Sequence, residues 1–152
     1  MPQSARRKSY MLPIGEKTFL FFFINNANYG MTGGQMAPTT IPGQKTTTTP
    51  SGRDTKTSGY PLRVSELLSS IEGVSFIQRA SVDSYKNLSA AKKAVEKAFR
   101  YQMEGQGFSF VEILSPCPTD WGMTPKKALE WIRDELMPVF PPVVIKDRPF
   151  GG

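Results

Sequence analysis

The sequence predicts an α/β fold with a three-layer architecture around a parallel sheet. Short apolar runs at residues 19–24, 74–81 and 108–114 alternate with segments of helical periodicity. The first of these runs, Phe-Leu-Phe-Phe-Phe-Ile, is apolar without alternation, which is typical of a strand buried on both faces of a parallel sheet. Strands and helices in this order are joined by right-handed crossovers, and 152 residues suffice for one domain with a core.

The first expected element is the strand over residues 19–24. Residues 1–18 show weak apolar periodicity, interrupted by Pro13 and Gly15, and we expect an irregular N-terminal segment there. Residues 25–61 are rich in glycine, proline and threonine. A loop of this length inside a compact domain is usually a binding loop or a disordered segment.

The remaining elements follow at regular intervals. A short helix over residues 63–73 ends at Gly73, and a strand follows over residues 74–81. Ser89 is the expected cap of a helix over residues 90–104, with one apolar face and one basic face. The apolar face comprises Ala91, Ala94, Val95, Ala98 and Phe99, and the basic face includes Lys92, Lys93, Lys97 and Arg100.

The C-terminal third begins after Gly105 and Gly107, which end that helix, with a strand over residues 108–114. Thr124 as N-cap and Pro125 at the first helical position open the last helix. Prolines 138, 141 and 142 end it, and we expect residues 138–152 to form an irregular tail.

The composition excludes several kinds of chemistry. The chain has no histidine, so a Ser-His-Asp or Cys-His arrangement and a histidine-ligated zinc site are excluded. Its single cysteine, Cys117, cannot form an internal disulfide, which favours a reducing, cytoplasmic setting. No apolar run reaches membrane-spanning length. The net charge of +6 permits an anionic partner, but the basic residues are not interleaved with aromatic ones, so nucleic-acid binding is disfavoured.

The stretch Asn-Asn-Ala-Asn-Tyr-Gly-Met-Thr-Gly-Gly-Gln after the first strand is the first candidate site. Magnesium binds amide and carbonyl oxygens, so the Asn26 side chain and the Asn28 backbone carbonyl are candidate ligands. Thr32, Gly33 and Gly34 offer backbone N–H groups and a hydroxyl for a diphosphate. The alternative is a tight turn, because asparagine and glycine both tolerate positive φ.

The second candidate is Ser-Pro-Cys-Pro-Thr-Asp-Trp-Gly-Met after the third strand. Cys117 is either a metal or cluster ligand, a reactive thiol, or a small buried side chain. The carboxyl ends of parallel strands meet at one edge of the sheet, where ligands bind, so the two stretches are expected to lie near each other.

Together, Asn-Asn-Ala-Asn-Tyr-Gly-Met-Thr-Gly-Gly-Gln and Ser-Pro-Cys-Pro-Thr-Asp-Trp-Gly-Met closely resemble the beta subunit of the 2-oxoacid:ferredoxin (acceptor) oxidoreductases, which use thiamine diphosphate. The resemblance covers residues 19–137 and implies a partial thiamine-diphosphate-binding domain of the pyrophosphate type. It is closest to the branch that acts on 2-oxoisovalerate and 2-oxoglutarate.

The resemblance implies roles for individual residues. Asn26 and Asn28 would bind the magnesium ion, and Cys117 would be the last ligand of a four-iron four-sulfur cluster. The residues that wrap the diphosphate would be Tyr29, Gly30, Met31, Thr32, Gly33, Gly34 and Gln35. The implied reaction is oxidative decarboxylation of a 2-oxo acid with coenzyme A as acyl acceptor and ferredoxin as electron acceptor, in a complex with alpha and gamma subunits. No side chain of this chain is assigned a catalytic role.

The sequence also departs from the family pattern. Gly15 is the only glycine before Gly30, and no aspartate precedes Asp54, so the Gly-Asp-Gly motif with its magnesium-binding carboxylate is missing. An N-terminal Cys-x-x-Cys stretch is missing as well. We therefore expect the C-terminal half of a beta subunit, inactive by itself. The alternatives are a non-catalytic fragment that docks on the other subunits and a basic nucleic-acid-binding protein.

Overall fold

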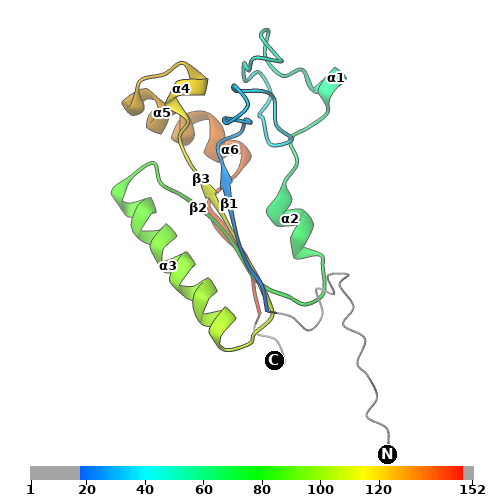
Figure 1. The fold of residues 1–152 in the computed structure, drawn as a ribbon, viewed down its shortest axis with the longest axis vertical. Helices are drawn as coiled ribbons and strands as arrows, with labels where there is room; N and C mark the ends of the chain where they lie inside the picture. Colours follow the sequence, from blue (N-terminus) through cyan, green and yellow to red (C-terminus); the bar gives the residue numbers. More distant parts are fainter. Residues whose placement is uncertain (1–17, 149–152) are drawn as a thin grey trace, which may run out of the picture.

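The computed structural model describes residues 18–148, which form a four-stranded sheet between two layers of helices (Figure 1). The strands are β1 (Leu20–Asn25), β2 (Val74–Ser81), β3 (Phe108–Leu114) and β4 (Val143–Asp147), in the order β1-β3-β2-β4. β1 and β2 each pair in parallel with β3, and their carboxyl ends lie together at the top of Figure 1. The α/β class and the three predicted strands are confirmed.

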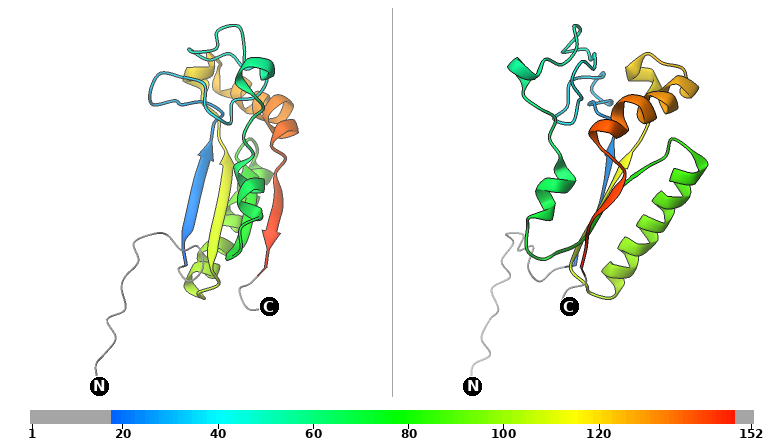
Figure 2. Two further views of the ribbon diagram at one scale, coloured as in Figure 1. Left: turned by 90° about the vertical axis from the view of Figure 1, so that its right-hand side faces the viewer. Right: turned by 180° about the vertical axis from the view of Figure 1, so that it is seen from behind.

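Two helices cover the two faces of the sheet. α3 (Tyr85–Met103) lies on one face and α2 (Val64–Ser69) on the other, as Figures 1 and 2 show. α3 begins five residues earlier than expected, because Ser84 rather than Ser89 is its N-cap. The Ser84 side chain accepts from the Asn87 N–H at 3.2 Å. Its alanine face packs on the sheet as predicted, whereas Phe99 is 49 % exposed.

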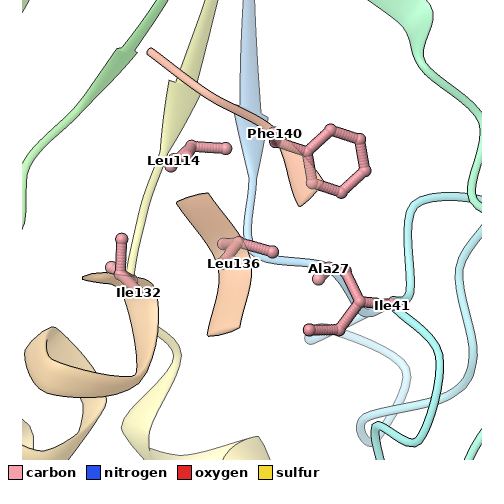
Figure 3. Packing of buried hydrophobic residues seen from close by; sticks show 6 residues of the cluster. All are labelled: Ala27, Ile41, Leu114, Ile132, Leu136 and Phe140. Carbon is pink, nitrogen blue, oxygen red and sulfur yellow. The ribbon is translucent and has the colours of Figure 1, made fainter. Parts of the chain in front are cut away.

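A third group of elements lies beyond the carboxyl ends of the parallel strands. α4 (Pro118–Trp121), α5 (Pro125–Trp131), a π-helical turn (Ile132–Leu136) and α6 (Met137–Val139) follow one another there. Thr124 caps α5 and Pro125 opens it, as predicted. Figure 3 shows the apolar cluster that joins these helices to the end of β1 and the following loop. Its buried members are Ala27, Ile41, Leu114, Ile132, Leu136 and Phe140.

Two expectations are wrong. The tail expected to be irregular contains β4, which pairs antiparallel with β2, so the sheet is mixed rather than wholly parallel. β1 is not buried on both faces: it is the edge strand of the described sheet, and Phe21 and Ile24 are 54 % and 55 % exposed. The domain limits of 19–137 stay a prediction, and the expected irregular segment over 1–18 lies, except for Thr18, outside the described residues.

The long loop before α2 is ordered in the structure. It contains the short helix α1 (Thr55–Ser58) and packs at the carboxyl end of β1, beside the α4–α6 group (Figure 2). Its centre is the guanidinium of Arg53, a residue only 6 % exposed that donates to several backbone carbonyls. Across residues 18–148, no helix is long and apolar enough to cross a membrane.

Candidate functional site

The two candidate stretches meet at the carboxyl ends of β1 and β3, as predicted. The indole Nε1 of Trp121 donates to the Asn26 carbonyl at 3.1 Å. A Cβ atom built on Gly30 would lie 2.8 Å from Asp120 Oδ2 and 3.6 Å from Cys117 Sγ. Glycine at position 30 therefore leaves room for this close approach, and a Cβ atom there would displace the Asp120 carboxylate.

A buried polar network underlies the end of β1. Asn25 is 1 % exposed, and its side-chain nitrogen donates to Glu112 Oε1 at 2.7 Å. Glu112 pairs in register with Arg79 on the neighbouring strand, and Arg79 Nε donates to Glu112 Oε2 at 2.8 Å. Ser65 also donates to this carboxylate, and Arg79 reaches Glu66 at the surface. The pKa of Glu66 is lowered because the hydrogen bonds and charge of Arg79 outweigh the opposing effect of burial.

Asn26 and Asn28 lie beyond this anchor with oxygens that bind little else. The Asn26 side-chain oxygen accepts only a long, 3.4 Å hydrogen bond from the Asn28 N–H among the described residues. Asn28 is 7 % exposed, yet within the described part of the chain neither its side-chain oxygen nor its nitrogen has a hydrogen-bond partner. Its backbone carbonyl likewise accepts no hydrogen bond from residues 18–148. Buried groups of this kind normally have a partner, so a ligand is expected here.

The following glycine-rich loop is closed on itself. The Tyr29 N–H donates to the Gln35 carbonyl at 2.9 Å, and the Gly34 N–H returns to the Tyr29 carbonyl at 3.0 Å. The Gly33 N–H donates to the Gly30 carbonyl at 3.1 Å. Both the Gly33 and the Gly34 N–H groups therefore bond within the loop, and a contact of these groups with a diphosphate stays a prediction.

The N–H groups that remain unpartnered lie earlier in the same loop. Within residues 18–148, the backbone N–H groups of Gly30, Met31 and Thr32 donate to no other group. Three consecutive unpartnered N–H groups beside unpartnered oxygens can bind an anion together with a cation. The Thr32 hydroxyl lies 3.3 Å from the side-chain oxygen of Gln35.

A pocket of about 250 Å³ opens beside the asparagines. Its polar lining includes Asn26, Asn28 and Tyr29, and its apolar wall includes Ile24 and Leu62. Ile24, an exposed side chain of the edge strand β1, thus forms part of the pocket wall beside the asparagines.

Cys117 lies at the start of α4, with its thiol directed at Asp120. The thiol donates to Asp120 Oδ2 at 2.9 Å. Burial, together with the neighbouring Asp120 carboxylate, raises the pKa of the Cys117 thiol. No group of three or more histidine, cysteine or acidic residues gathers in the described part of the chain, so these residues alone do not fit a four-iron cluster.

Substitution of Asp120 by asparagine is expected to lower the pKa of Cys117, because the negative charge beside the thiol is removed. Alkylation by iodoacetamide at pH 8 should then be faster than in the unsubstituted chain, since the thiolate is the reacting form. Rates measured between pH 7 and pH 10 check this. An unchanged pH–rate profile would show that Asp120 does not contribute to the raised pKa of the Cys117 thiol.

Several residues of this region were missed in the sequence. Thr40 and Gln44 bind the Ala27 carbonyl from 13 and 17 residues away and give no local signal, whereas Asn25 accepts from the Ala27 N–H two residues on, the usual spacing of an Asx turn. Glu112 and Arg79 did give a signal, because each is the lone charge in its strand, and buried charges of opposite sign pair. The indole of Trp121 also binds the loop, and it packs against Trp131 with ring centroids 4.4 Å apart.

One protein-family model matches most of the chain. Residues 16–113 match the family model described as the thiamine pyrophosphate enzyme, C-terminal TPP binding domain. The match includes the whole Asn26–Asn28 turn and the glycine-rich loop.

Curated proteins with similar sequences are subunits of oxidoreductases and synthases. Ketoisovalerate oxidoreductase subunit VorA of Methanothermobacter marburgensis is 46 % identical over 134 residues, which are 88 % of this chain and 28 % of that protein. 2-Oxoglutarate synthase subunit KorB of Archaeoglobus fulgidus is 36 % identical over 113 residues, 74 % of this chain and 38 % of that protein. Pyruvate synthase subunit PorB of Methanothermobacter thermautotrophicus is 29 % identical over 111 residues, 73 % of this chain and 36 % of that protein. The chain therefore spans about a third of the length of these relatives.

Proposed function

Because the chain belongs to the thiamine pyrophosphate enzymes, within their C-terminal TPP-binding domain family, we propose that residues 26–35 bind the magnesium ion and the diphosphate of thiamine diphosphate. The Asn26 side chain and the Asn28 backbone carbonyl are the proposed magnesium ligands. Tyr29, Gly30, Met31, Thr32, Gly33, Gly34 and Gln35 form the proposed diphosphate loop.

One observation carries this proposal: the loop holds both kinds of unpartnered group that a magnesium–diphosphate pair requires. Asn28 offers a carbonyl and a buried side chain without partners among the described residues. The next three residues after Tyr29 offer N–H groups without partners in residues 18–148. Magnesium takes oxygen ligands and shares them with phosphates, and successive N–H groups bind phosphate oxygens, so the donor set fits.

The glycines have separate roles in this proposal. Gly30 allows Asp120 to approach, and Gly34, with φ of 74°, would place a Cβ atom 3.2 Å from the Asp120 side chain. Gly33 and Gly34 close the loop through their own N–H groups, whereas the N–H groups of Gly30, Met31 and Thr32 have no partner within residues 18–148. The backbone N–H of Thr47, in the threonine-rich run of residues 46–49, also holds the loop, because it donates to the Gly34 carbonyl at 2.9 Å.

We further propose that the chain is part of a subunit that oxidatively decarboxylates a 2-oxo acid of the ketoisovalerate or 2-oxoglutarate type. The names of the first relatives support this substrate class. Thiamine diphosphate supplies the electron sink for decarboxylation when bound, and the protein positions it. Alpha and gamma subunits, coenzyme A and ferredoxin are the proposed partners in the complete enzyme.

The isolated chain is proposed to be inactive. Its proposed magnesium ligands are neutral oxygens, and the Asp120 carboxylate beside the loop accepts a hydrogen bond from the Cys117 thiol. Cys117 is proposed as one ligand of an iron–sulfur cluster whose other cysteines come from elsewhere in a complete subunit. The described residues of this chain do not fit such a cluster by themselves.

A binding and activity experiment tests the proposal. Thiamine diphosphate is expected to bind the chain only when magnesium is present, and more weakly than micromolar, because the proposed magnesium ligands among residues 18–148 are neutral oxygens. Asn26→Ala should remove this binding, whereas Asn87→Ala, the same change on α3, should leave it unchanged. Calorimetric titration measures both, and viologen reduction with 2-oxoisovalerate should be absent. Viologen reduction by the isolated chain would refute the proposed inactivity, and micromolar affinity would refute the expected weak binding. Equal binding by both variants would refute the proposed site.

A further inference from the structure

Ala27, between the two proposed magnesium ligands, has an unusual backbone conformation. Its φ is 56°, which makes it the non-glycine residue with positive φ in the described part of the chain. Left-handed alanine is disfavoured by its Cβ atom, so it persists only where surrounding contacts hold it. The residue is fully buried.

Three side chains hold the two peptide groups of Ala27. The Asn25 side-chain oxygen accepts from the Ala27 N–H at 3.0 Å. The Ala27 carbonyl accepts from the Thr40 hydroxyl at 2.6 Å and from the Gln44 side-chain nitrogen at 3.1 Å. The methyl group of Ala27 packs in the apolar cluster beside Ile41 (Figure 3).

The two donors from the long loop are themselves fixed. The Thr40 hydroxyl accepts from the Ala37 N–H at 2.8 Å while it donates to Ala27. The Gln44 side-chain oxygen accepts from the Ile41 N–H at 3.0 Å while its nitrogen donates. Both side chains are buried, so each is committed to one orientation.

The conformation of Ala27 affects how the two proposed ligands face each other. The φ and ψ torsions of Ala27 lie on the covalent path between the Asn26 side chain and the Asn28 carbonyl, so a rotation there changes the relative direction of the two oxygens. The Asn26 carbonyl is already bound by Trp121, so the Asn26 side chain and the Asn28 carbonyl remain for a cation. A rotation at Ala27 would separate these oxygens, and an octahedral magnesium ion tolerates little displacement.

We propose that Thr40 and Gln44 are positioning residues for the magnesium–diphosphate loop. They act through the Ala27 carbonyl, and they hold Ala27 left-handed so that the Asn26 side chain and the Asn28 carbonyl face one cation. This inference rests on the function proposed above and assigns to the loop before α2 a part in cofactor binding.

Three variants test this inference. Thr40→Val keeps the shape of the side chain and removes the hydroxyl, whereas Thr40→Ser keeps the hydroxyl. Thr46→Val is the matched control, because Thr46 is also buried in this loop but its hydroxyl bonds only within the threonine-rich run. Two readouts are needed. The first is the conformation of Ala27 without ligand, from its amide–Hα three-bond coupling and its carbon chemical shifts. The second is the affinity for thiamine diphosphate with magnesium.

Thr40→Val is expected to shift the Ala27 signals away from left-handed values and to weaken binding about tenfold, the loss expected for one hydrogen bond. Thr40→Ser and Thr46→Val should keep both readouts near those of the unsubstituted chain. Unchanged Ala27 signals in Thr40→Val, or an equal loss of affinity in Thr46→Val, would overturn the inference. If the unsubstituted chain binds no cofactor, the proposed function fails, and the Ala27 signals alone still decide whether Thr40 holds the turn. Gln44→Met repeats the test at the second donor.

Discussion

Substitution of Glu112 by alanine is expected to destabilise the domain by about 3–5 kcal/mol, the range for removal of one partner from a buried ion pair. The Glu112 carboxylate is fully buried and accepts hydrogen bonds from Arg79, Asn25 and Ser65. Without it, the Arg79 guanidinium stays buried with Glu66 as its remaining carboxylate, and the side chain of Glu66 is 37 % exposed.

The same substitution is expected to loosen the proposed cofactor loop. Asn25 loses the acceptor of its side-chain nitrogen, although its oxygen still accepts from the Ala27 N–H. The Asn25 amide can then rotate, and the turn that follows β1 loses one of its anchors. Thiamine diphosphate binding should therefore weaken in Glu112→Ala even at temperatures where the variant is folded.

Urea unfolding at pH 7 measures the first effect. Glu66→Ala is the matched control, since it removes the more exposed partner of the same arginine and should cost clearly less. The double variant Arg79→Met, Glu112→Leu should recover much of the loss, because an apolar pair leaves no buried charge. A loss of unfolding free energy below about 1 kcal/mol in Glu112→Ala would contradict the description of Glu112 and Arg79 as a buried ion pair.

Substitution of Arg53 by alanine is expected to unfold the loop before α2 while the sheet stays folded. The guanidinium donates to backbone carbonyls on both sides of the loop, and each carbonyl left buried without a donor costs about 1–3 kcal/mol. The acceptors, with their distances, are Ala37 (3.4 Å), Pro38 (3.0 Å), Thr40 (2.6 Å), Ser58 (3.0 Å), Gly59 (3.1 Å) and Tyr60 (3.1 Å). A local loss of about 3 kcal/mol or more is therefore expected.

Hydrogen exchange followed residue by residue distinguishes local from global loss. In Arg53→Ala, the N–H groups of residues 40–53 should lose protection, and those of β2 and β3 should keep it. Arg53→Lys should rescue only in part, because an ammonium group lacks the planar fork of five donors. Arg63→Ala, which removes an exposed arginine with a 4.0 Å ion pair, is the control. Unchanged protection of residues 40–53 in Arg53→Ala would show that the loop is held by something else.

The parts of the fold that the sequence predicted well are those whose signals are local. β2 and β3 match their predicted limits because a glycine, Gly73 or Gly107, directly precedes each run. The start of α5 matches because Thr124 and Pro125 are a cap and a first-turn residue. The start of α3 was misplaced because two serines, Ser84 and Ser89, both suit an N-cap, and packing on the sheet decides between them.

The parts that were missed depend on contacts between distant residues. The left-handed turn at Ala27 is held by side chains 2, 13 and 17 residues away, and no local pattern announces two of these. β4 follows three prolines, and its five residues become a strand only by pairing with β2. The glycine-rich loop was recognised by its residues. Which of its N–H groups stay without a partner could not be predicted, because that depends on how Gly33 and Gly34 close the loop.

Paramagnetic broadening by Mn²⁺, a hard cation that replaces Mg²⁺ at oxygen sites, tests the central claim most directly. With thiamine diphosphate present, the amide signals of residues 26–32 of the isotope-labelled chain should broaden first. Thiamine without its diphosphate should not produce this pattern. If Mn²⁺ instead broadens signals elsewhere in the chain most strongly, or if the pattern is the same with and without the diphosphate, the loop after β1 is not the magnesium–diphosphate site of this chain.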